Sequence, residues 1–544
     1  MRPVVLLILD GWGVAPAGAG NAIMLSKLPF YTRLLSTFPH CLLQASGEAV
    51  GLPKGEDGNT ETGHLNLGAG HIVYQDLPRI NLSIADGTFF RNPAFLEAIN
   101  HARKYESNIH LLGLIGSGGV HSNIEHLLAL IQLMKEQSFN RIFLHLICDG
   151  RDSPPKSSVI YIKQILAFLQ SVGFGKIASV MGRYFAMDRD NRWDRTEKAY
   201  KCLTEGIGEK GSDPLEVVNA AYAKGITDEF ILPTNILKEG KPIAKIQEND
   251  SVIFYNFRID RPRQLTKAFV LEDFEKEANI SDFDPFAVKY FKKHTVLPAD
   301  IKPAFKRGEK IPHLYFVTMT EYSRNVHASA VAYPPHVVVY PIGECISHMG
   351  LSQLRLSESE KERFVTYYFN GQREVPFINE DRIIIPSPKV PTYDLKPEMS
   401  ALELTETLIE KVQGKIYDFI VVNFANPDMV AHTGVIPATI KACETVDLCL
   451  SQIIPAVVNI GGTAFVTADH GNAEEMIDPQ TGGIDTEHST FPVPFIAVNK
   501  SWEGKNLSLP MGILADVAPT ILKAMHIEVP YSMTGRNLLE NVIE

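Results

Sequence analysis

The sequence lacks the features that mark membrane, secreted and nucleic-acid-binding proteins. None of its apolar runs approaches the ~20 residues that a membrane-spanning helix needs. The run at residues 4–9 is too short for a secretory signal and has no cleavage site after it. Positive charge is not in excess, because the formal net charge is −11, which argues against general binding to nucleic acid or to a membrane surface. We therefore expect a cytoplasmic protein, and any anionic substrate must be held by a local cluster of positive charge.

Cysteine is also scarce. The six cysteines are scattered and form no Cys-x-x-Cys pair, so we expect buried thiols in a reducing compartment rather than a disulfide framework. The rest of the composition, with 45% hydrophobic and 21% charged residues, is that of an ordinary globular protein. A chain of 544 residues exceeds the size at which a single core stops growing, so two domains are expected.

The most informative segment of the sequence is DGNTETGH, residues 57–64. Gly58 and Gly63 allow a tight turn and a close approach of another group to the backbone. Thr60 is expected to open a polar turn or a short helix, whose free N–H groups favour an anionic oxygen. Thr60 is therefore a candidate nucleophile for a phosphoryl group. On its own the pattern is more typical of a turn or N-cap residue, so the interpretation depends on partners elsewhere in the chain.

Aspartate and histidine follow three expected buried strands, at residues 4–9, 419–424 and 463–468. Each such residue alone would be an ordinary loop residue, but together they suit a metal site. Asp428 and His432 stand at i and i+4, which places them on one face if a helix begins at Pro427. Three carboxylates and three imidazoles suit two divalent ions such as Mn²⁺ or Zn²⁺ better than one. The set comprises Asp10, Asp428, His432, Asp469, His470 and His488.

Histidine or arginine follows four further apolar strands, expected at residues 109–115, 142–147, 176–180 and 251–257. An α/β sheet forms its ligand crevice beyond the carboxyl ends of its strands. Arginine binds phosphate and carboxylate through its planar fork, so these strand ends predict an anion site. Asp152 would serve there as general acid or base. The basic residues are His121, Arg151, Arg183, Arg189, Arg258 and Arg261.

These motifs resemble those of the cofactor-independent (2,3-bisphosphoglycerate-independent) phosphoglycerate mutases of the alkaline phosphatase superfamily. The resemblance covers almost the whole chain in the family's order. The matching segments include LDGWG, GNTETGHLNLGAG, GGVHS, DGRDSPP, GRYFAMDRDNRWDR, FYNFRIDRPRQL, SEKERFVTYYFNG, NFANPDMVAHTG, TADHGN and TEHSTFPVPF.

The resemblance implies an α/β fold with two domains. An alkaline-phosphatase-like, metal-binding sheet domain, residues 1–76 and 334–544, would be split around an inserted α/β phosphotransferase domain, residues 77–333. It further implies a glycolytic isomerase that interconverts 2-phosphoglycerate and 3-phosphoglycerate through a phosphothreonine at Thr60, without 2,3-bisphosphoglycerate. We expect a monomer with a small-molecule substrate and with no nucleic-acid or membrane partner.

The resemblance also implies roles for individual residues. The ions, expected to be Mn²⁺, would be divided between two ligand sets: Asp428, His432 and His488 for one, and Asp10, Asp469, His470 and the Thr60 hydroxyl for the other. The glycerate would be held by His121, Arg151, Asp152, Arg183 and Arg189, and the phosphate by Arg258, Arg261 and Lys361. Thr60, Asp152 and Lys361 would be the catalytic residues.

The sequence departs from the family pattern at two positions. Thr60 stands where the family has serine, which keeps the hydroxyl but adds a methyl group and a stiffer χ1. Ser117-Gly118 replaces the usual Ser-Asp-Gly. The sister phosphopentomutases use threonine as nucleophile, so a phosphopentomutase or a metal-dependent phosphomonoesterase is the alternative. A non-catalytic sensor of phosphorylated metabolites would be expected to have lost metal ligands.

Two further expectations concern local structure. The chain is longer than typical family members, and we assign the excess to surface loops around residues 207–240 and 290–312. The run FVTYYF, residues 364–369, is rich in β-branched and aromatic residues and predicts a strand.

Overall fold

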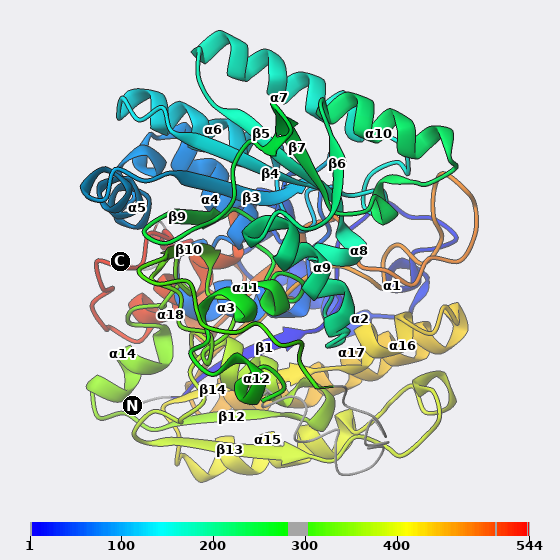
Figure 1. Cartoon of the computed structure of the whole chain (residues 1–544). Helices are drawn as coiled ribbons and strands as arrows, with labels where there is room; N and C mark the ends of the chain where they lie inside the picture. The colour runs from blue at the N-terminus through cyan, green and yellow to red at the C-terminus, as the bar shows by residue number, and fades with distance from the viewer. Residues whose placement is uncertain (1–2, 281–302, 506, 508, 541, 543–544) are drawn as a thin grey trace. The chain divides into compact units, whose positions relative to one another are not determined.

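A computed structural model describes residues 3–280, 303–505, 507, 509–540 and 542. The chain divides into two compact units, each with its own sheet (Figure 1). Met1–Pro78 and His336–Glu544 form the discontinuous unit, and Arg79–Pro335 form the inserted unit. Residues 290–302, where we expected part of a surface loop, lie outside the described residues.

The discontinuous unit contains an eight-stranded sheet in the order β13-β12-β14-β1-β15-β16-β2-β17. The strands from β13 to β15 are parallel, and β16 is antiparallel to both of its neighbours. The strands are β1 (Val4–Leu9), β2 (His40–Gln44), β12 (Gln353–Glu358), β13 (Glu380–Ile385), β14 (Phe419–Phe424), β15 (Thr463–Thr467), β16 (Val493–Val498) and β17 (Gly512–Ile513). Every residue of β1, β12 and β14 is buried, as expected for parallel strands covered on both faces.

Helices complete the core of the discontinuous unit. Helix α15 packs against α17, and α17 also packs against α1, α2 and α16. In Figure 1, α15 runs beside β12 and β13. The helices are α1 (Ala22–Leu25), α2 (Pro29–Thr37), α3 (Thr60–Ala69), α14 (Ile342–His348), α15 (Ala401–Gly414), α16 (Asn426–Ala431), α17 (Ile436–Asn459) and α18 (Val517–Ala524).

The inserted unit contains the second sheet, in the order β11-β10-β9-β3-β4-β5-β7-β6, with β8 paired to β7. The strands from β11 to β5 are parallel. The strands are β3 (Ile109–Ile115), β4 (Ile142–Cys148), β5 (Lys176–Gly182), β6 (Glu209–Gly211), β7 (Thr234–Lys238), β8 (Lys241–Pro242), β9 (Ser251–Phe254), β10 (Tyr315–Thr320) and β11 (Ala330–Tyr333). The four strands expected to carry basic residues are β9, β3, β4 and β5, which are neighbours in the sheet.

The inserted unit is completed by helices on its sheet. Helix α5 packs against β9, β10 and β11, and α7 packs against α6 and α10. The helices are α5 (Pro93–Lys104), α6 (Ile124–Glu136), α7 (Ser158–Val172), α8 (Arg183–Ala186), α9 (Trp193–Thr204), α10 (Pro214–Ala223), α11 (Arg263–Val270) and α12 (Phe274–Glu277). Helix α4 (Asp76–Ala85) contains the boundary between the units.

Two local expectations were wrong. Residues 207–240 are not a surface loop, because they contain β6, α10 and β7, and β7 extends the sheet beside β5. The run at residues 364–369 is not a strand, because Phe364–Tyr368 form a π-helix, labelled η5. Its aromatic side chains at Phe364 and Tyr368 stack with ring centroids 5.7 Å apart, which is the i, i+4 contact of a helix.

The π-helix forms because it packs against α3. Phe364 and Tyr368 share a hydrophobic cluster with Leu65 and Ala69 of α3. The backbones approach so closely that a Cβ on Gly68 would lie 1.9 Å from the Phe369 carbonyl oxygen. Tertiary packing has therefore overridden the local preference of these residues for a strand.

The six cysteines are all buried free thiols, which confirms the expectation that they form no disulfide framework. Among the described residues, no helix is both long and apolar enough to span a lipid bilayer.

Candidate active site

The candidate site of the discontinuous unit lies at one edge of its sheet. Four neighbouring parallel strands deliver polar residues there: Lys361 follows β12, Asp428 follows β14, Asp10 follows β1, and Asp469 follows β15. Strand β16 is antiparallel to β15, so it begins at the same edge, and the segment that leads into it contributes His488. The topology thus gathers residues that are up to several hundred positions apart in the chain.

Thr60 is the first residue of α3, as the sequence predicted. The side chain of Asn59 caps the helix by accepting a hydrogen bond of 2.9 Å from the Thr62 N–H. The Thr60 side chain is buried, and its Oγ1 lies 2.9 Å from Nε2 of His470. The hydroxyl is therefore held at a helix N-terminus, where partial positive charge favours an anion.

Two glycines let the Thr60 segment approach the aspartate and histidine residues. A Cβ on Gly58 would lie 2.1 Å from the Ala45 carbonyl oxygen and 2.9 Å from the His470 Cβ. A Cβ on Gly63 would lie 2.4 Å from the Asp469 carbonyl oxygen. Any larger residue would therefore push α3 away from the site.

Lys361 lies at the centre of this cluster and is buried. Its Nζ donates to Asp10 Oδ1 and Asp428 Oδ2, each at 2.7 Å, and to Thr60 Oγ1 at 3.2 Å. Burial opposes the charge of the ammonium group, but the carboxylates of Asp10, Asp428 and Asp469 outweigh burial and raise the pKa of Lys361. The cluster thus has a strong preference for positive charge.

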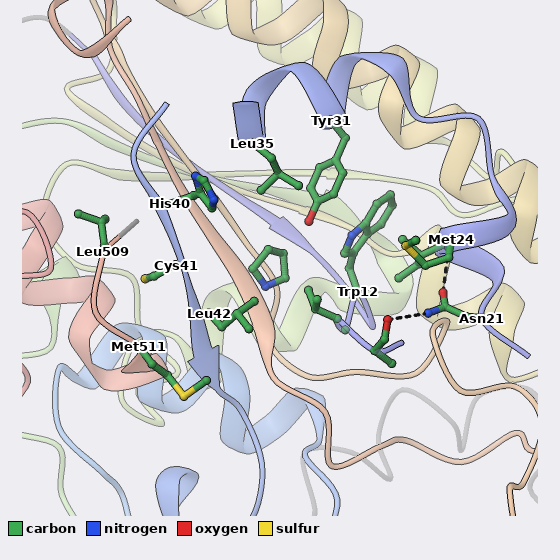
Figure 2. Close-up of a pocket in the computed structure, with 15 residues that line it drawn as sticks. Trp12, Asn21, Met24, Tyr31, Leu35, His40, Cys41, Leu42, Leu509 and Met511 are labelled. Carbon is green, nitrogen blue, oxygen red and sulfur yellow. Dashed lines mark hydrogen bonds between the residues drawn. The ribbon is translucent and has the colours of Figure 1, made fainter. Parts of the chain in front are cut away.

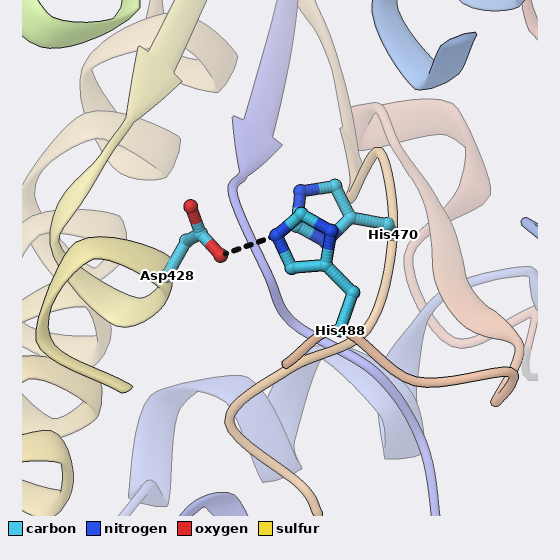
Figure 3. A group of neighbouring side chains, drawn as sticks. All are labelled: Asp428, His470 and His488. Carbon is cyan, nitrogen blue, oxygen red and sulfur yellow. Dashed lines mark ion pairs between the residues drawn. The ribbon is translucent and has the colours of Figure 1, made fainter. Parts of the chain in front are cut away.

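Two overlapping groups of side chains could each hold a metal ion. Asp428, His470 and His488 bring ligand atoms within 4.8 Å of one another (Figure 3), as do Asp10, Asp469 and His470. His432 also belongs here, because its Nε2 lies 3.3 Å from Asp428 Oδ1 and 3.2 Å from His488 Nε2. All seven residues predicted as ligands, including Thr60, therefore meet in one cluster.

His432, His470 and His488 each have one ring nitrogen next to a backbone carbonyl oxygen. Nδ1 of His432 lies 2.7 Å from the Thr486 carbonyl oxygen, Nδ1 of His470 lies 3.1 Å from that of Gly471, and Nδ1 of His488 lies 2.9 Å from that of Gly58. A ring whose Nδ1–H donates to a carbonyl presents its Nε2 lone pair, and metal-ligating histidines are commonly fixed in this way. Each Nε2 faces the aspartates of the cluster.

The buried carboxylates also favour a cation. Asp10, Asp428 and Asp469 are buried in one cluster, and Asp469 Oδ2 lies 3.1 Å from Nδ1 of His64 and 3.5 Å from Nε2 of His470. Buried carboxylates gathered in this way are stable only with cationic or hydrogen-bonding partners close to them. The donor set of aspartate oxygens and imidazole nitrogens suits divalent first-row metals such as Mn²⁺ or Zn²⁺. The residues present therefore fit the expected ions.

The inserted unit contains a second cluster, at the carboxyl ends of β9, β3, β4 and β5. A cavity of about 240 Å³ there is lined by Arg151, Arg183, Arg189, Arg192, Arg195 and Arg261, among other residues. The guanidinium groups influence one another: burial and the charges of Arg183, Arg189 and Arg151 lower the pKa of Arg261. Asp188, Asp190 and Glu229 also line the cavity, but the arginines outnumber them, and such a concentration of guanidinium groups suits an anion.

Asp152 and His121 lie beside these arginines. Burial opposes ionisation of Asp152, but its hydrogen bond to Arg183 and the nearby positive charges outweigh burial and lower its pKa. Burial, together with the charge of Arg183, lowers the pKa of His121 to about 4. At neutral pH, Asp152 is therefore a carboxylate that can accept a proton, and His121 is a neutral imidazole.

Arg258 does not line the cavity, and it joins the cluster through Asp260. One Asp260 oxygen lies 3.3 Å from Arg258 Nε and 3.6 Å from His121 Nδ1, and the other accepts from Arg189 at 3.0 Å. All the predicted basic residues are thus gathered in this cluster. Asp260 lies between two of the predicted arginines in the sequence, but only the folded structure shows that it connects them.

Comparisons with known proteins identify the family of this chain. A family model described as the N-terminus of BPG-independent PGAM matches residues 80–324. The 2,3-bisphosphoglycerate-independent phosphoglycerate mutase of Chloroflexus aggregans is 49% identical over 542 residues, which cover 99% of this chain and 98% of that protein. The enzyme of the same name from Moorella thermoacetica is 48% identical over 538 residues, 99% of this chain and 98% of that protein.

This chain belongs to the family of 2,3-bisphosphoglycerate-independent phosphoglycerate mutases. It is therefore an enzyme, an isomerase. The phosphoglycerate mutase of Leishmania mexicana, whose crystal structures were obtained at low cobalt concentration, shares the fold with a TM-score of 0.53 and 28% identity, over 98% of this chain and 97% of that chain.

The sequence did not predict the role of two residues, His64 and Asn423, that connect the cluster around Thr60. His64 and Asn423 are fully buried. His64 Nδ1 lies 3.0 Å from the Thr60 carbonyl oxygen and 3.1 Å from Asp469 Oδ2. Asn423 donates to Asp10 Oδ2 at 2.6 Å and lies 3.1 Å from His64 Nε2. His64 and Asn423 therefore link the carboxylates of Asp469 and Asp10. The sequence held one indication of this role: His64 stands four residues after Thr60, so on a helix the two residues share one face.

Asn472 and Glu474 support the part of the cluster around Thr60 that contains Asp428. The Asn472 amide donates to Asp428 Oδ1 at 2.8 Å. Glu474 accepts from the backbone N–H groups of Asn472 and Gly13, each at 2.9 Å, and from the Ser489 hydroxyl. These bonds fix the loop after β15 to the turn after β1. Hydrogen-bonded supports of this kind orient metal ligands.

Proposed function

We propose that this enzyme interconverts 2-phosphoglycerate and 3-phosphoglycerate through a phosphothreonine at Thr60. The observation that carries the proposal is the environment of the Thr60 hydroxyl. It is buried at a helix N-terminus, 2.9 Å from Nε2 of His470 and 3.2 Å from Nζ of Lys361. A hydroxyl is a poor nucleophile at its ordinary pKa and needs such activation.

We assign two divalent ions, expected to be Mn²⁺, to the aspartate and histidine cluster. One would be held by Asp428, His432 and His488, and the other by Asp10, Asp469, His470 and the Thr60 hydroxyl. When bound, these ions would lower the pKa of the threonine hydroxyl and polarise the phosphoryl oxygens. The Lys361 ammonium adds a positive charge beside Thr60 Oγ1, where it would stabilise the negative charge of the transferring phosphoryl group.

The basic residues of the inserted unit are proposed to bind glycerate and phosphate. Arg151, Arg183 and Arg189 suit the carboxylate of glycerate, because guanidinium groups bind carboxylates bidentately. Arg258 and Arg261 would complete the binding of the phosphate. His121 is neutral, so it can donate one hydrogen bond and accept another without adding charge.

Asp152 would exchange the proton. In the first transfer, the bond between phosphorus and one glycerate oxygen breaks, a bond to Thr60 Oγ1 forms, and the proton that the Thr60 hydroxyl loses ends on the departing oxygen. In the second transfer, the other glycerate hydroxyl loses a proton as it attacks the phosphothreonine. Since one oxygen gains what the other loses, a single carboxyl group can serve both steps.

The proposal is tested by trapping the phosphoenzyme. The full-length protein with Mn²⁺ is mixed with 3-phosphoglycerate labelled in its phosphate and quenched with acid, and the labelled peptide is identified by mass spectrometry. We expect label on Thr60, and 2-phosphoglycerate as product without added 2,3-bisphosphoglycerate. Label on Thr62 would place the nucleophile two residues further on, and product formation without any labelled protein would exclude the covalent route.

The alternatives are distinguished by substrate. A phosphopentomutase would act on ribose 1-phosphate, and a phosphomonoesterase would release free phosphate from either substrate. We expect conversion of 3-phosphoglycerate with little free phosphate and no conversion of ribose 1-phosphate. We also propose a cytoplasmic monomer, because the net charge and the free thiols suit that compartment. Analytical ultracentrifugation and cell fractionation test these two points.

A further inference from the structure

The discontinuous unit contains a second cavity that the mutase reaction does not use. Its volume is about 510 Å³, and it is bounded by residues of the turn after β1, of α1 and α2, and of β2 and β16 (Figure 2). None of the aspartates, histidines or other residues of the cluster around Thr60 lines it. A cavity of this size is far larger than a packing void and matches sites for small organic molecules.

Apolar side chains form most of the cavity wall. Ile23, Leu35 and Leu42 line it, and Met24 and Met511 also face it. These two methionines are 59% and 50% exposed, so they belong to the rim, where solvent enters. Flexible thioether side chains adapt to ligands of different shape. The wall therefore suits an uncharged molecule.

Four polar side chains interrupt the apolar wall. Those of Asn21 and His40 bond to nearby backbone groups, which leaves Trp12 and Tyr31. The Trp12 indole is fully buried, and its Nε1–H makes no hydrogen bond of good geometry within the described residues, although the Tyr31 hydroxyl lies near it. Tyr31 packs against it with ring centroids 5.2 Å apart. In Figure 2 the indole nitrogen and the Tyr31 hydroxyl lie side by side and point toward the middle of the lining residues. Burial raises the pKa of Tyr31, so its hydroxyl stays protonated and can also donate.

Both donors are held in place by the fold. Tyr31 lies in the first turn of α2, where Asp447 of α17 accepts hydrogen bonds from the backbone N–H groups of Phe30 at 3.2 Å and Tyr31 at 2.6 Å. Trp12 lies in the turn that follows β1, and its backbone N–H donates to the Leu9 carbonyl oxygen at 3.2 Å. The site is therefore pre-formed, which lowers the entropic cost of binding.

We propose that this cavity binds an uncharged aromatic carbonyl compound, whose rings pack between the apolar walls and whose oxygen accepts hydrogen bonds from Trp12 and Tyr31. A carbonyl oxygen has two lone pairs, so it can satisfy both donors at once. A carboxylate or phosphate fits less well, because neither lysine nor arginine lines the cavity among the described residues, and Nδ1 of the lining histidine, His40, lies 3.0 Å from the Phe38 carbonyl oxygen.

The test compares two probes of the same shape. Benzophenone carries the carbonyl group, and diphenylmethane replaces it by a methylene. Each is titrated into the full-length protein while tryptophan fluorescence is recorded. We expect saturable binding of both, with benzophenone about tenfold tighter, since one hydrogen bond to a buried donor is worth about that factor. Equal affinities would overturn the role of the carbonyl oxygen.

The location is tested by cross-linking. Benzophenone reacts with nearby C–H bonds on near-ultraviolet irradiation, and mass spectrometry identifies the modified peptides. We expect modification at Met24 or Met511. Modification confined to residues outside the cavity lining, or the absence of saturable binding, would overturn the site.

Variants complete the test. Trp12→Phe keeps an aromatic wall but removes the donor, so benzophenone should bind it only as tightly as diphenylmethane does. If that variant does not fold, Met24→Asp decides the question, because a charge at the rim should weaken both probes at least tenfold. Met349→Asp is the matched control: Met349 is also 59% exposed in the same unit but does not line the cavity. Equal weakening by both aspartate variants would contradict the proposal.

Discussion

The ammonium group of Lys361 lies 3.2 Å from the hydroxyl oxygen of Thr60 and simultaneously bridges Asp10 and Asp428. This relationship gives Lys361 two roles: it supplies positive charge at the nucleophile, and it neutralises two buried carboxylates. Both roles require a cation at this position, so an uncharged side chain of similar length should be a severe substitution.

We expect Lys361→Met to lower kcat by on the order of 10² or more, because a preorganised charge beside the transferring phosphoryl group is lost. Steady-state assays with saturating Mn²⁺ measure this effect. Lys505→Met, which removes an exposed lysine of the same unit, should leave kcat unchanged. If Lys361→Met kept near-normal kcat and only raised KM, the lysine would contribute to ground-state binding alone.

Thr60→Ala should lower turnover by on the order of 10³ or more and abolish phosphoenzyme labelling, because the covalent intermediate cannot form. Thr60→Ser should retain substantial activity, since it loses only a methyl group. Thr62→Ala is the control, because the Thr62 hydroxyl bonds to Asn59 rather than to the cluster. Near-normal activity of Thr60→Ala would require the covalent mechanism to be given up.

Removal of divalent metal should abolish activity and lower the melting temperature. The cluster concentrates the carboxylates of Asp10, Asp428 and Asp469 in a buried site, and a cation that binds only the folded state stabilises it by mass action. Calorimetry with chelator and then with added Mn²⁺ measures the shift. Asp469→Asn should lose most of the shift, whereas Asp381→Asn, at an exposed position of the same unit, should keep it. A melting temperature insensitive to Mn²⁺ would speak against the site.

Stability should fall as the pH drops below about 6.5 because of buried histidines in the inserted unit. Burial lowers the pKa of His126 to about 3, and it also lowers the pKa of His145 well below its usual range. Below the unfolded pKa of about 6.5 the unfolded chain binds protons that the folded chain cannot. Each such histidine then costs about 1.4 kcal/mol of unfolding free energy per pH unit.

Urea unfolding at about pH 7.5 and about pH 5 measures this loss of stability. His126→Gln should reduce the difference between the two conditions by up to about 2 kcal/mol, since one of the titrating groups is gone. His327→Gln, at an exposed histidine of the same unit, should leave the difference unchanged. An equal effect of the two variants would show that burial of His126 is not the cause.

The sequence by itself determined the buried strands and the residues that follow them. A short continuous apolar run such as Val4–Leu9 is typical of a strand covered on both faces, and the polar residue that ends it, Asp10, is then expected at the edge of a sheet. The same reasoning located Asp428, Asp469 and the basic residues after β3, β4, β5 and β9. It needed no knowledge of which strands are neighbours.

Other elements could not be predicted because their local sequence favours a different structure. FVTYYF has the composition of a strand, yet it forms a π-helix, since its aromatic side chains are buried only when they pack on α3. The sequence predicted a loop where β7 lies. This strand is stabilised by pairing with β5 and β6, which are other segments of the chain. Pairing partners of this kind are not visible in a local window.

What only the tertiary structure decided is which side chains touch. The sequence identified Thr60, Lys361 and the metal ligands as separate motifs, whereas the order β12-β14-β1-β15 brings them to one place. The supporting contacts of His64 with Asp469 and of Asn423 with Asp10 depend on side-chain geometry across strands and a helix far apart in sequence. A motif indicates the type of chemistry. Distances of about 3 Å between residues that are far apart in the sequence depend on packing, which no local pattern encodes.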